Sequence, residues 1–180
     1  ILAAALVVTD ADGATAAAAA AEVESRAAGD ETARAWALLA GCIVDLSCVT
    51  TAARLDATRE VLRIARETGD DELVPTAFFL HLAALADLGE TADLDLALSP
   101  VGPLLAAFPW LDEGRHAAWF RCLRATIDGQ TERAEAFADR GYALAAAAGD
   151  PDALSVRIGQ LSVLAWLRGT VVEYEPAFLA

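Results

Sequence analysis

The sequence contains no lysine, no asparagine and no methionine. Without lysine the chain cannot form the phosphate-binding loop G-x-x-x-x-G-K-[ST], whose lysine contacts the phosphates of a nucleotide. All 13 basic residues are therefore arginines, and 27 acidic residues bring the net charge to −14. Nucleic-acid binding needs basic side chains gathered on one face, so this excess of acid argues against a nucleic-acid partner.

The missing residue types also bear on the source of the chain. Lysine, asparagine and methionine have AT-leaning codons, whereas alanine, glycine, arginine and aspartate do not, so we expect a GC-rich bacterial genome. An initiator methionine is not normally removed before a residue as large as Ile1. We therefore expect this chain to be an internal piece of a longer protein.

Long uncharged hydrophobic runs are missing as well. Hydrophobic residues make up 56% of the chain and the mean hydropathy is +0.40, but much of this excess is alanine, the strongest helix former. No window of about 18 residues is free of both charges and helix breakers, which predicts no membrane-spanning helix. Residues 1–8 are too short to span a bilayer and lack the basic flank and cleavage site of a signal peptide. We expect a cytoplasmic location.

Catalytic and metal-binding patterns are missing too. The chain has no G-x-S-x-G, H-E-x-x-H or C-x-x-C motif. The three cysteines, at positions 42, 48 and 122, fit buried thiols in a reducing compartment. His81 and His116 each lack a second ligand three or four residues away, so we interpret them as surface or partner-facing imidazoles. We expect no enzyme activity, no cofactor and no metal; the alternative is an enzyme domain with a deep pocket at His81, His116 or Arg121.

Glycine, in contrast, recurs at a period of 40 residues. Gly29, Gly69 and Gly149 each precede an aspartate, and a second set at positions 89, 129 and 169 lies 20 residues out of phase. A period of this length with a half-period is typical of stacked helix hairpins. Glycine just after a helix adopts the left-handed conformation that closes it, and the following aspartate caps the next helix.

These signals predict an all-α chain. The expected helices cover residues 14–28, 31–48, 51–68, 71–88, 91–107, 112–128, 131–148 and 151–168, and another starts at Val171. Pro100 and Pro103 should break or bend the helix over 91–107, and Asp112 should cap the next one. We predict a TPR-like α-solenoid of antiparallel hairpins with a 40-residue period, forming a single domain over residues 1–180.

The hairpin resembles a tetratricopeptide repeat, although its unit is longer than the usual 34 residues. The stretch from Thr131 through Gly149-Asp150-Pro151 to Leu154, followed by Trp166-Leu167-Arg168-Gly169, is similar to the helical repeats of actinobacterial LuxR/MalT-type multidomain ATPase regulators. That resemblance implies a protein-interaction or ligand-sensing module of a transcriptional regulator, with ATP hydrolysis and DNA binding in other domains. The alternative is an oligomerisation scaffold of an ATPase-cyclase protein.

One polar cluster is the candidate binding site. Arg121, Arg124 and Asp128 share a face of the helix over 112–128, and His81 occupies the matching position one repeat earlier. We predict His81, Arg121, Arg124 and the neighbouring Trp119 as binding residues, since arginine suits the capture of carboxylates and phosphates. The alternative is a solvated stripe whose arginines pair with acids of the neighbouring repeat.

Several partners fit such a module. A protein or peptide, other domains of the same chain and a small anionic ligand are all compatible with this face. A homodimer is a further expectation, because an incomplete solenoid exposes the apolar faces that its missing neighbours would cover. The tryptophans at positions 36, 110, 119 and 166 fit either core packing or an aromatic-lined groove.

Overall fold

The computed structural model describes residues 10–46 and 48–174. Every regular element within these ranges is a helix, which confirms the all-α prediction, while the TPR-like solenoid with a 40-residue period stays a prediction. The chain divides between Leu94 and Asp95 into two compact units, which are described in turn below. Within the described ranges no helix is both long and apolar enough to cross a bilayer.

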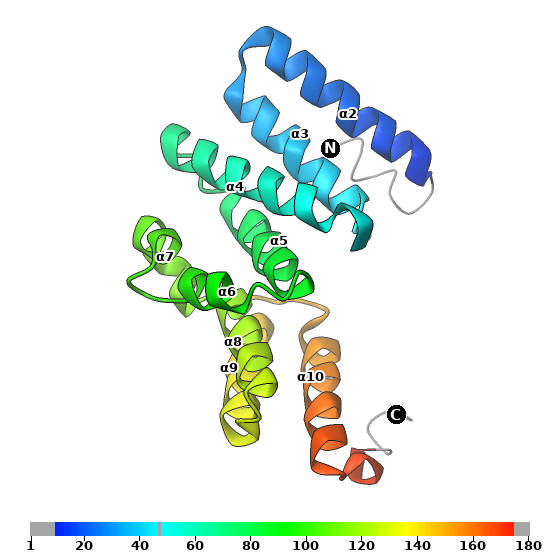
Figure 1. The fold of residues 1–180 in the computed structure, drawn as a ribbon, viewed down its shortest axis with the longest axis vertical. Helices are drawn as coiled ribbons and strands as arrows, with labels where there is room; N and C mark the ends of the chain where they lie inside the picture. The colour runs from blue at the N-terminus through cyan, green and yellow to red at the C-terminus, as the bar shows by residue number, and fades with distance from the viewer. Residues whose placement is uncertain (1–9, 47, 175–180) are drawn as a thin grey trace. The chain divides into compact units, whose positions relative to one another are not determined.

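The first unit is a run of helices in which each contacts the next along the chain (Figure 1). Its elements are α2 (Ala11–Ala28), α3 (Glu31–Val44), the 3-10 turn η1 (Cys48–Thr50), α4 (Thr51–Thr68) and α5 (Val74–Asp87). α3 also contacts α5, so that α3 to α5 form a packed group. Its fully buried side chains include Val61 and Ile64 of α4 and Phe78, Leu82 and Leu85 of α5, and the three of α5 have the three- and four-residue spacing of one helix face.

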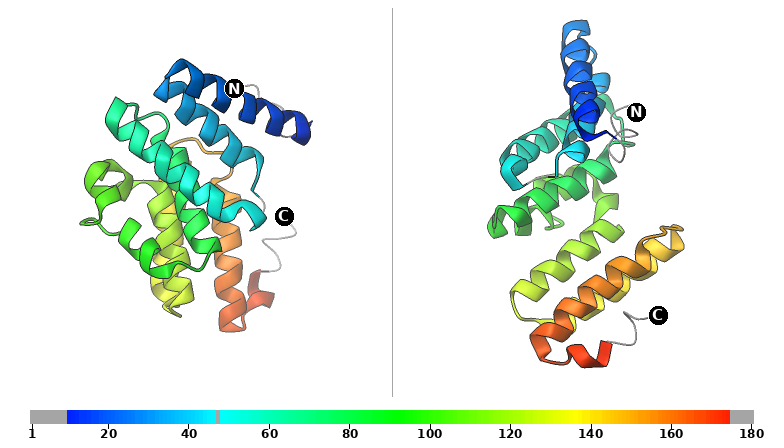
Figure 2. Two further views of the ribbon diagram at one scale, coloured as in Figure 1. Left: turned by 45° about the horizontal axis from the view of Figure 1, so that its top comes forward. Right: turned by 90° about the vertical axis from the view of Figure 1, so that its right-hand side faces the viewer.

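The second unit is built around three helices packed side by side (Figure 2). α6 (Thr91–Ala97) crosses the division, and α7 (Pro103–Ala107), η2 (Pro109–Glu113), α8 (Arg115–Ile127), α9 (Thr131–Ala147), α10 (Ala153–Arg168) and η3 (Val171–Tyr174) follow. α9 contacts both α8 and α10. Small residues dominate the buried cluster between them: Cys122, Ala125, Ala134, Ala138, Leu161 and Leu164.

Six glycines have left-handed backbone conformations. Their φ angles lie between 68° and 74°, at positions 29, 69, 89, 129, 149 and 169. Each follows the end of a long helix, and these are the six positions of the two sequence registers. The prediction that these glycines close helices is therefore confirmed.

Two alanine substitutions should separate backbone conformation from crowding. A Cβ on Gly149, at the end of α9, meets no atom within 4 Å, but its φ of 72° is strained for any residue with a Cβ. Gly149→Ala should lower the free energy of unfolding by about 1 kcal/mol. Gly159, inside α10, is equally open, so Gly159→Ala should raise it by roughly 0.5–1 kcal/mol. Urea denaturation measures both, and two changes of the same sign would contradict this explanation.

The helix starts differ from the prediction. Asp30 caps α3 as expected, since its carboxylate accepts a hydrogen bond of 2.9 Å from the backbone N–H of Ala33. The prediction that Asp70 and Asp150 are N-caps is wrong. Each carboxylate accepts a hydrogen bond from the backbone N–H two residues ahead, and α5 and α10 start later than residues 71 and 151. Asp112 is not a cap either, because it lies in η2 while α8 begins at Arg115.

Proline interrupts the chain where the sequence predicts. Instead of one helix over 91–107, α6 ends at Ala97 and α7 begins at Pro103. Pro103 occupies the first turn of α7, where its missing N–H leaves no helix hydrogen bond unmade. The expected helix over 31–48 is also shorter, ending at Val44.

Candidate functional site

His81 lies inside the first unit. It is 9% exposed on α5, and its Nδ1 is 3.1 Å from the hydroxyl of Thr58 on α4. Burial, followed by the charge of Arg59, lowers the pKa of His81 to about 4, against a smaller opposing effect of Asp93. A buried neutral imidazole cannot meet a partner at the surface, so the interpretation of His81 as a surface or partner-facing group is wrong.

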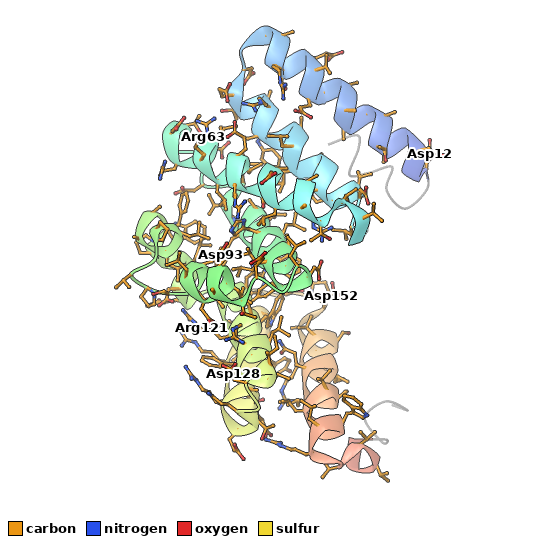
Figure 3. The ribbon with its side chains drawn as sticks, in the orientation of Figure 1. Asp12, Arg63, Asp93, Arg121, Asp128 and Asp152 are labelled. Carbon is orange, nitrogen blue, oxygen red and sulfur yellow. The ribbon has the colours of Figure 1, made fainter. Side chains whose placement is uncertain are left out.

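Arg121 ties α8 to the segments before it in the second unit (Figure 3). Its guanidinium donates to the carboxylate of Asp112, to the Asp112 carbonyl at 3.1 Å and to the Leu98 carbonyl at 2.9 Å. Only 18% of the side chain is exposed. Most of its donors are therefore used within the unit.

Arg124 is paired as well. Its Nε and Nη2 donate to the two carboxylate oxygens of Asp95 at 2.7 and 3.0 Å, and Nη1 donates to Asp128 at 3.2 Å. This bidentate pair lowers the pKa of Asp95 and raises the pKa of Arg124. Both arginines pair with acids, as the alternative expected, but their side chains are only 18% and 15% exposed, so they do not form a solvated stripe.

Trp119 packs between helices. A Cβ on Gly141 of α9 would lie 2.5 Å from the indole Cδ1, so only glycine lets the ring approach this closely. The ring centroid of His116 is 5.3 Å from that of Trp119, and the Arg115 guanidinium lies 6.0 Å away. Trp119 thus has a packing role between α8 and α9.

The predicted residues do not form one described site. Arg121, Arg124 and Trp119 share α8 of the second unit, whereas His81 belongs to the first. Residues two apart on a helix do not face each other, so Trp119 and Arg121 point in different directions. Whether Arg121, Arg124 and Trp119 contact a partner stays a prediction.

Reactive groups are also scarce. Over residues 10–46 and 48–174, no three His, Cys, Asp or Glu side chains gather as metal ligands. Burial raises the pKa of Cys42 to about 11 and also raises that of Cys122, so both thiols stay protonated at neutral pH.

A groove in the first unit was not expected from the sequence. We call it the α2–α4 groove: it has a volume of about 280 Å³ and lies between α2, α3 and the start of α4. Small residues form most of its lining: Thr15, Ala18, Ala19, Glu22, Ala37, Leu38, Gly41, Cys42, Val44, Asp45, Thr50, Ala53, Arg54 and Ala57. The alanine run over residues 16–21 is the one sequence signal that bears on it, since helices with short side chains leave such space.

Arg54 is the buried charge of this groove. Only 3% of its side chain is exposed, and Nη2 donates to Asp87 at 2.8 Å and to the Thr51 hydroxyl at 3.3 Å. Nη1 lies 3.4 Å from the Asp45 carbonyl at the end of α3. Arg54 therefore joins the end of α3, the start of α4 and the end of α5.

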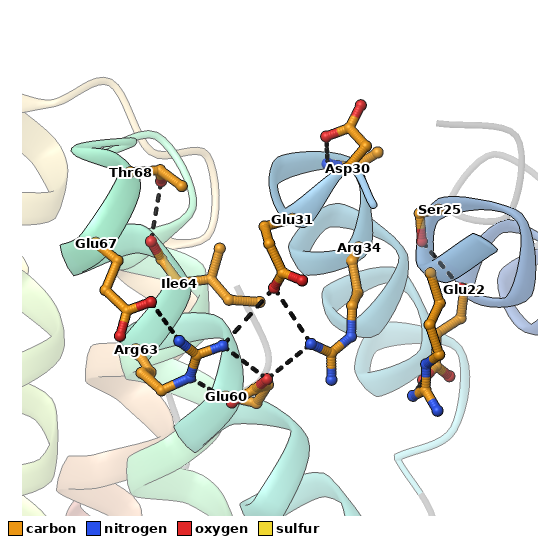
Figure 4. Close-up of polar contacts among 12 residues, drawn as sticks. Glu22, Ser25, Asp30, Glu31, Arg34, Glu60, Arg63, Ile64, Glu67 and Thr68 are labelled. Carbon is orange, nitrogen blue, oxygen red and sulfur yellow. Dashed lines mark hydrogen bonds and ion pairs between the residues drawn. The ribbon is translucent and has the colours of Figure 1, made fainter. Parts of the chain in front are cut away.

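An ion-pair network holds α3 to α4 at another place (Figure 4). Glu60 accepts from Arg63 at 2.7 Å on its own helix and pairs with Arg34 of α3 at 2.9 Å. Arg63 also reaches Glu31 at 3.7 Å, and the hydrogen bond from Arg63 is the main reason that the pKa of Glu60 is lowered. Such partly exposed pairs contribute little individually, but this network fixes the relative position of two groove walls.

Comparisons with protein-family models, curated proteins and solved structures found no match to this chain. The groove and the residues around it therefore carry the functional argument.

Proposed function

We propose that this chain is a protein-interaction module of a cytoplasmic bacterial regulatory protein, and that the α2–α4 groove binds a segment of its partner. The observation that carries the proposal is the groove itself: an open depression lined mainly by alanine, glycine, leucine and valine, at the boundary of three helices. Its volume of about 280 Å³ is slightly below that of small-molecule pockets, which occupy roughly 300–1,000 Å³. A few apolar side chains of a partner fit such a space better than a cofactor does.

The chemistry of the lining supports binding over catalysis. Cys42 is the one thiol of the lining, and its raised pKa keeps it protonated. Arg54 is bonded to Asp87, which leaves hydrophobic contact as the main interaction that the groove offers. The resemblance to the repeats of LuxR/MalT-type regulators supports placing the module in a regulatory protein.

A second candidate function, an oligomerisation scaffold, is favoured by the last helix of the second unit. Val163, Trp166 and Leu167 of α10 are 49%, 72% and 49% exposed, and Val172 of η3 is 79% exposed. Contiguous exposed apolar side chains mark interaction surfaces. Light scattering that compares the mass of the Trp166→Ser variant with that of the unchanged protein tests this function. We expect the variant to form a smaller assembly.

Selection from a phage-displayed library of random amphipathic helices tests the main proposal. Gly41 of α3 lines the groove, and a Cβ there meets no atom within 4 Å, so Gly41→Leu should place a branched apolar side chain in part of the groove. Gly159→Leu, inside α10 and equally open, is the matched control. We expect the selected helices to bind the unchanged protein and the Gly159→Leu variant equally well. Their affinity for the Gly41→Leu variant should be more than tenfold weaker. Selection of no helix that distinguishes the two variants would overturn the proposal.

A further inference from the structure

We infer that the occupant of the α2–α4 groove is an amphipathic helix whose narrow apolar face is flanked by arginine or lysine. This inference rests on the proposed function and specifies the partner's secondary structure and charge.

The helical walls of the groove favour a helical partner segment. Nearly all of its lining comes from α2, α3 and α4, whose backbone groups are hydrogen-bonded within those helices. An extended peptide that binds by strand addition pairs its backbone with an open sheet edge, and no strand exists in the described residues. A helix satisfies its backbone internally, so it can enter an apolar groove without leaving polar groups unpaired.

The short side chains of the lining determine the shape of the face. Ala18, Ala19, Ala37, Gly41 and Ala53 allow another helix to approach closely, because the distance between packed helices depends on the side chains at their contact. A volume of about 280 Å³ then suits a few small or medium apolar side chains rather than a row of aromatic ones. The apolar face of the partner is therefore narrow.

Charge determines what flanks that face. Of the three charged residues in the lining, Glu22 and Asp45 are acidic, and the third, Arg54, is 3% exposed and bonded to Asp87. Glu22 pairs with Arg26 one turn along α2, at 2.7 Å, but 65% of the Arg26 side chain is exposed. Such a pair is weak, so an incoming cation can replace it.

The net charge of the first unit is also negative. Residues 1–94 contain 16 acidic residues and six arginines, a difference of ten negative charges. A basic segment is attracted to this field, which speeds its association and selects it over acidic competitors. A second copy of this chain has a net charge of −14, so it lacks the excess of basic side chains that this groove attracts.

The experiment uses the helices selected on the protein, synthesised as labelled peptides and titrated by fluorescence anisotropy. We expect the selected sequences to carry arginine or lysine beside the apolar face, and their binding to weaken as salt rises. Glu22→Gln should weaken it about three- to fivefold. Glu24→Gln makes the same change of charge on α2 outside the groove lining, and it should leave the affinity nearly unchanged.

The outcomes distinguish a failure of this inference from a failure of the proposed function. If the groove-dependent helices are acidic or neutral, or if glutamine in place of their basic residues leaves binding intact, the inference is overturned and the proposed function stands. If no selected helix depends on the groove, both are overturned. If light scattering shows a dimer that Gly41→Leu dissociates, the occupant is a second copy and the inference is wrong.

Discussion

Asp87→Ala should destabilise the protein more than Arg54→Met, although the two substitutions break the same ion pair. The side chain of Arg54 is 3% exposed, whereas that of Asp87 is 54% exposed. Removing Asp87 leaves a buried cation without this carboxylate, which should cost about 3 kcal/mol. Removing Arg54 leaves an anion that water already reaches, and methionine fills the space of the arginine stem, so the cost should be about 1 kcal/mol.

Urea denaturation of both variants and of the double variant measures this asymmetry. In the double variant the buried cation is gone, so its stability should stay close to that of Arg54→Met. Glu90→Ala, which removes an exposed acid after α5, is the control for the change of net charge and should have little effect. Equal losses for Asp87→Ala and Arg54→Met would show that the burial of Arg54 does not govern the energetics of the pair.

The protein should lose stability between pH 7 and pH 5 because of His81. The folded-state pKa of His81 is about 4, below the ordinary value of 6.5, so the unfolded chain takes up a proton in this range and the folded chain does not. The stabilisation is complete above pH 6.5 and is lost as the pH falls toward 4. A shift of this size corresponds to about 2 kcal/mol between pH 7 and pH 5.

The hydrogen bonds of Thr58 place the proton of the neutral imidazole on Nδ1, and burial disfavours the addition of a second proton. Thr58 donates its one hydroxyl proton to the Leu55 carbonyl at 2.9 Å, so the Nδ1–H of His81 donates to the Thr58 oxygen. A second proton would then sit on Nε2 in a buried position, with the Arg59 charge nearby.

Chemical denaturation at a series of pH values checks this dependence. His81→Gln should lower the stability at pH 7 and flatten the profile between pH 7 and pH 5. His116→Gln, which changes the other histidine of the chain, should keep the slope. The pKa values of Glu60 and Asp95 are lowered by their arginine partners, so the stability that these carboxylates contribute is lost mainly below pH 5 and adds little to this slope. A profile that His81→Gln leaves unchanged would contradict the assignment.

The sequence by itself determined where six of the long helices end. A left-handed glycine closes a helix through bonds to residues a few positions before it, and a proline breaks one through its own ring, so Gly149 and Pro103 act locally. The apolar spacing of Phe78, Leu82 and Leu85, at three and four residues, likewise indicates the buried face of α5. The helix starts were less predictable, because the same Gly-Asp step gives a cap at Asp30 and an earlier turn at Asp70.

Only the tertiary structure decided what the polar side chains do. His81 lies on a helix whose sequence offers a similar apolar surface on several sides, and its burial depends on α4 bringing Thr58 against it. Arg124 is engaged by Asp95, which is distant in sequence, and the α2–α4 groove needs three helices at once. Pairing and cavities depend on which surfaces meet in space, and a repeat period specifies helix ends without specifying those contacts.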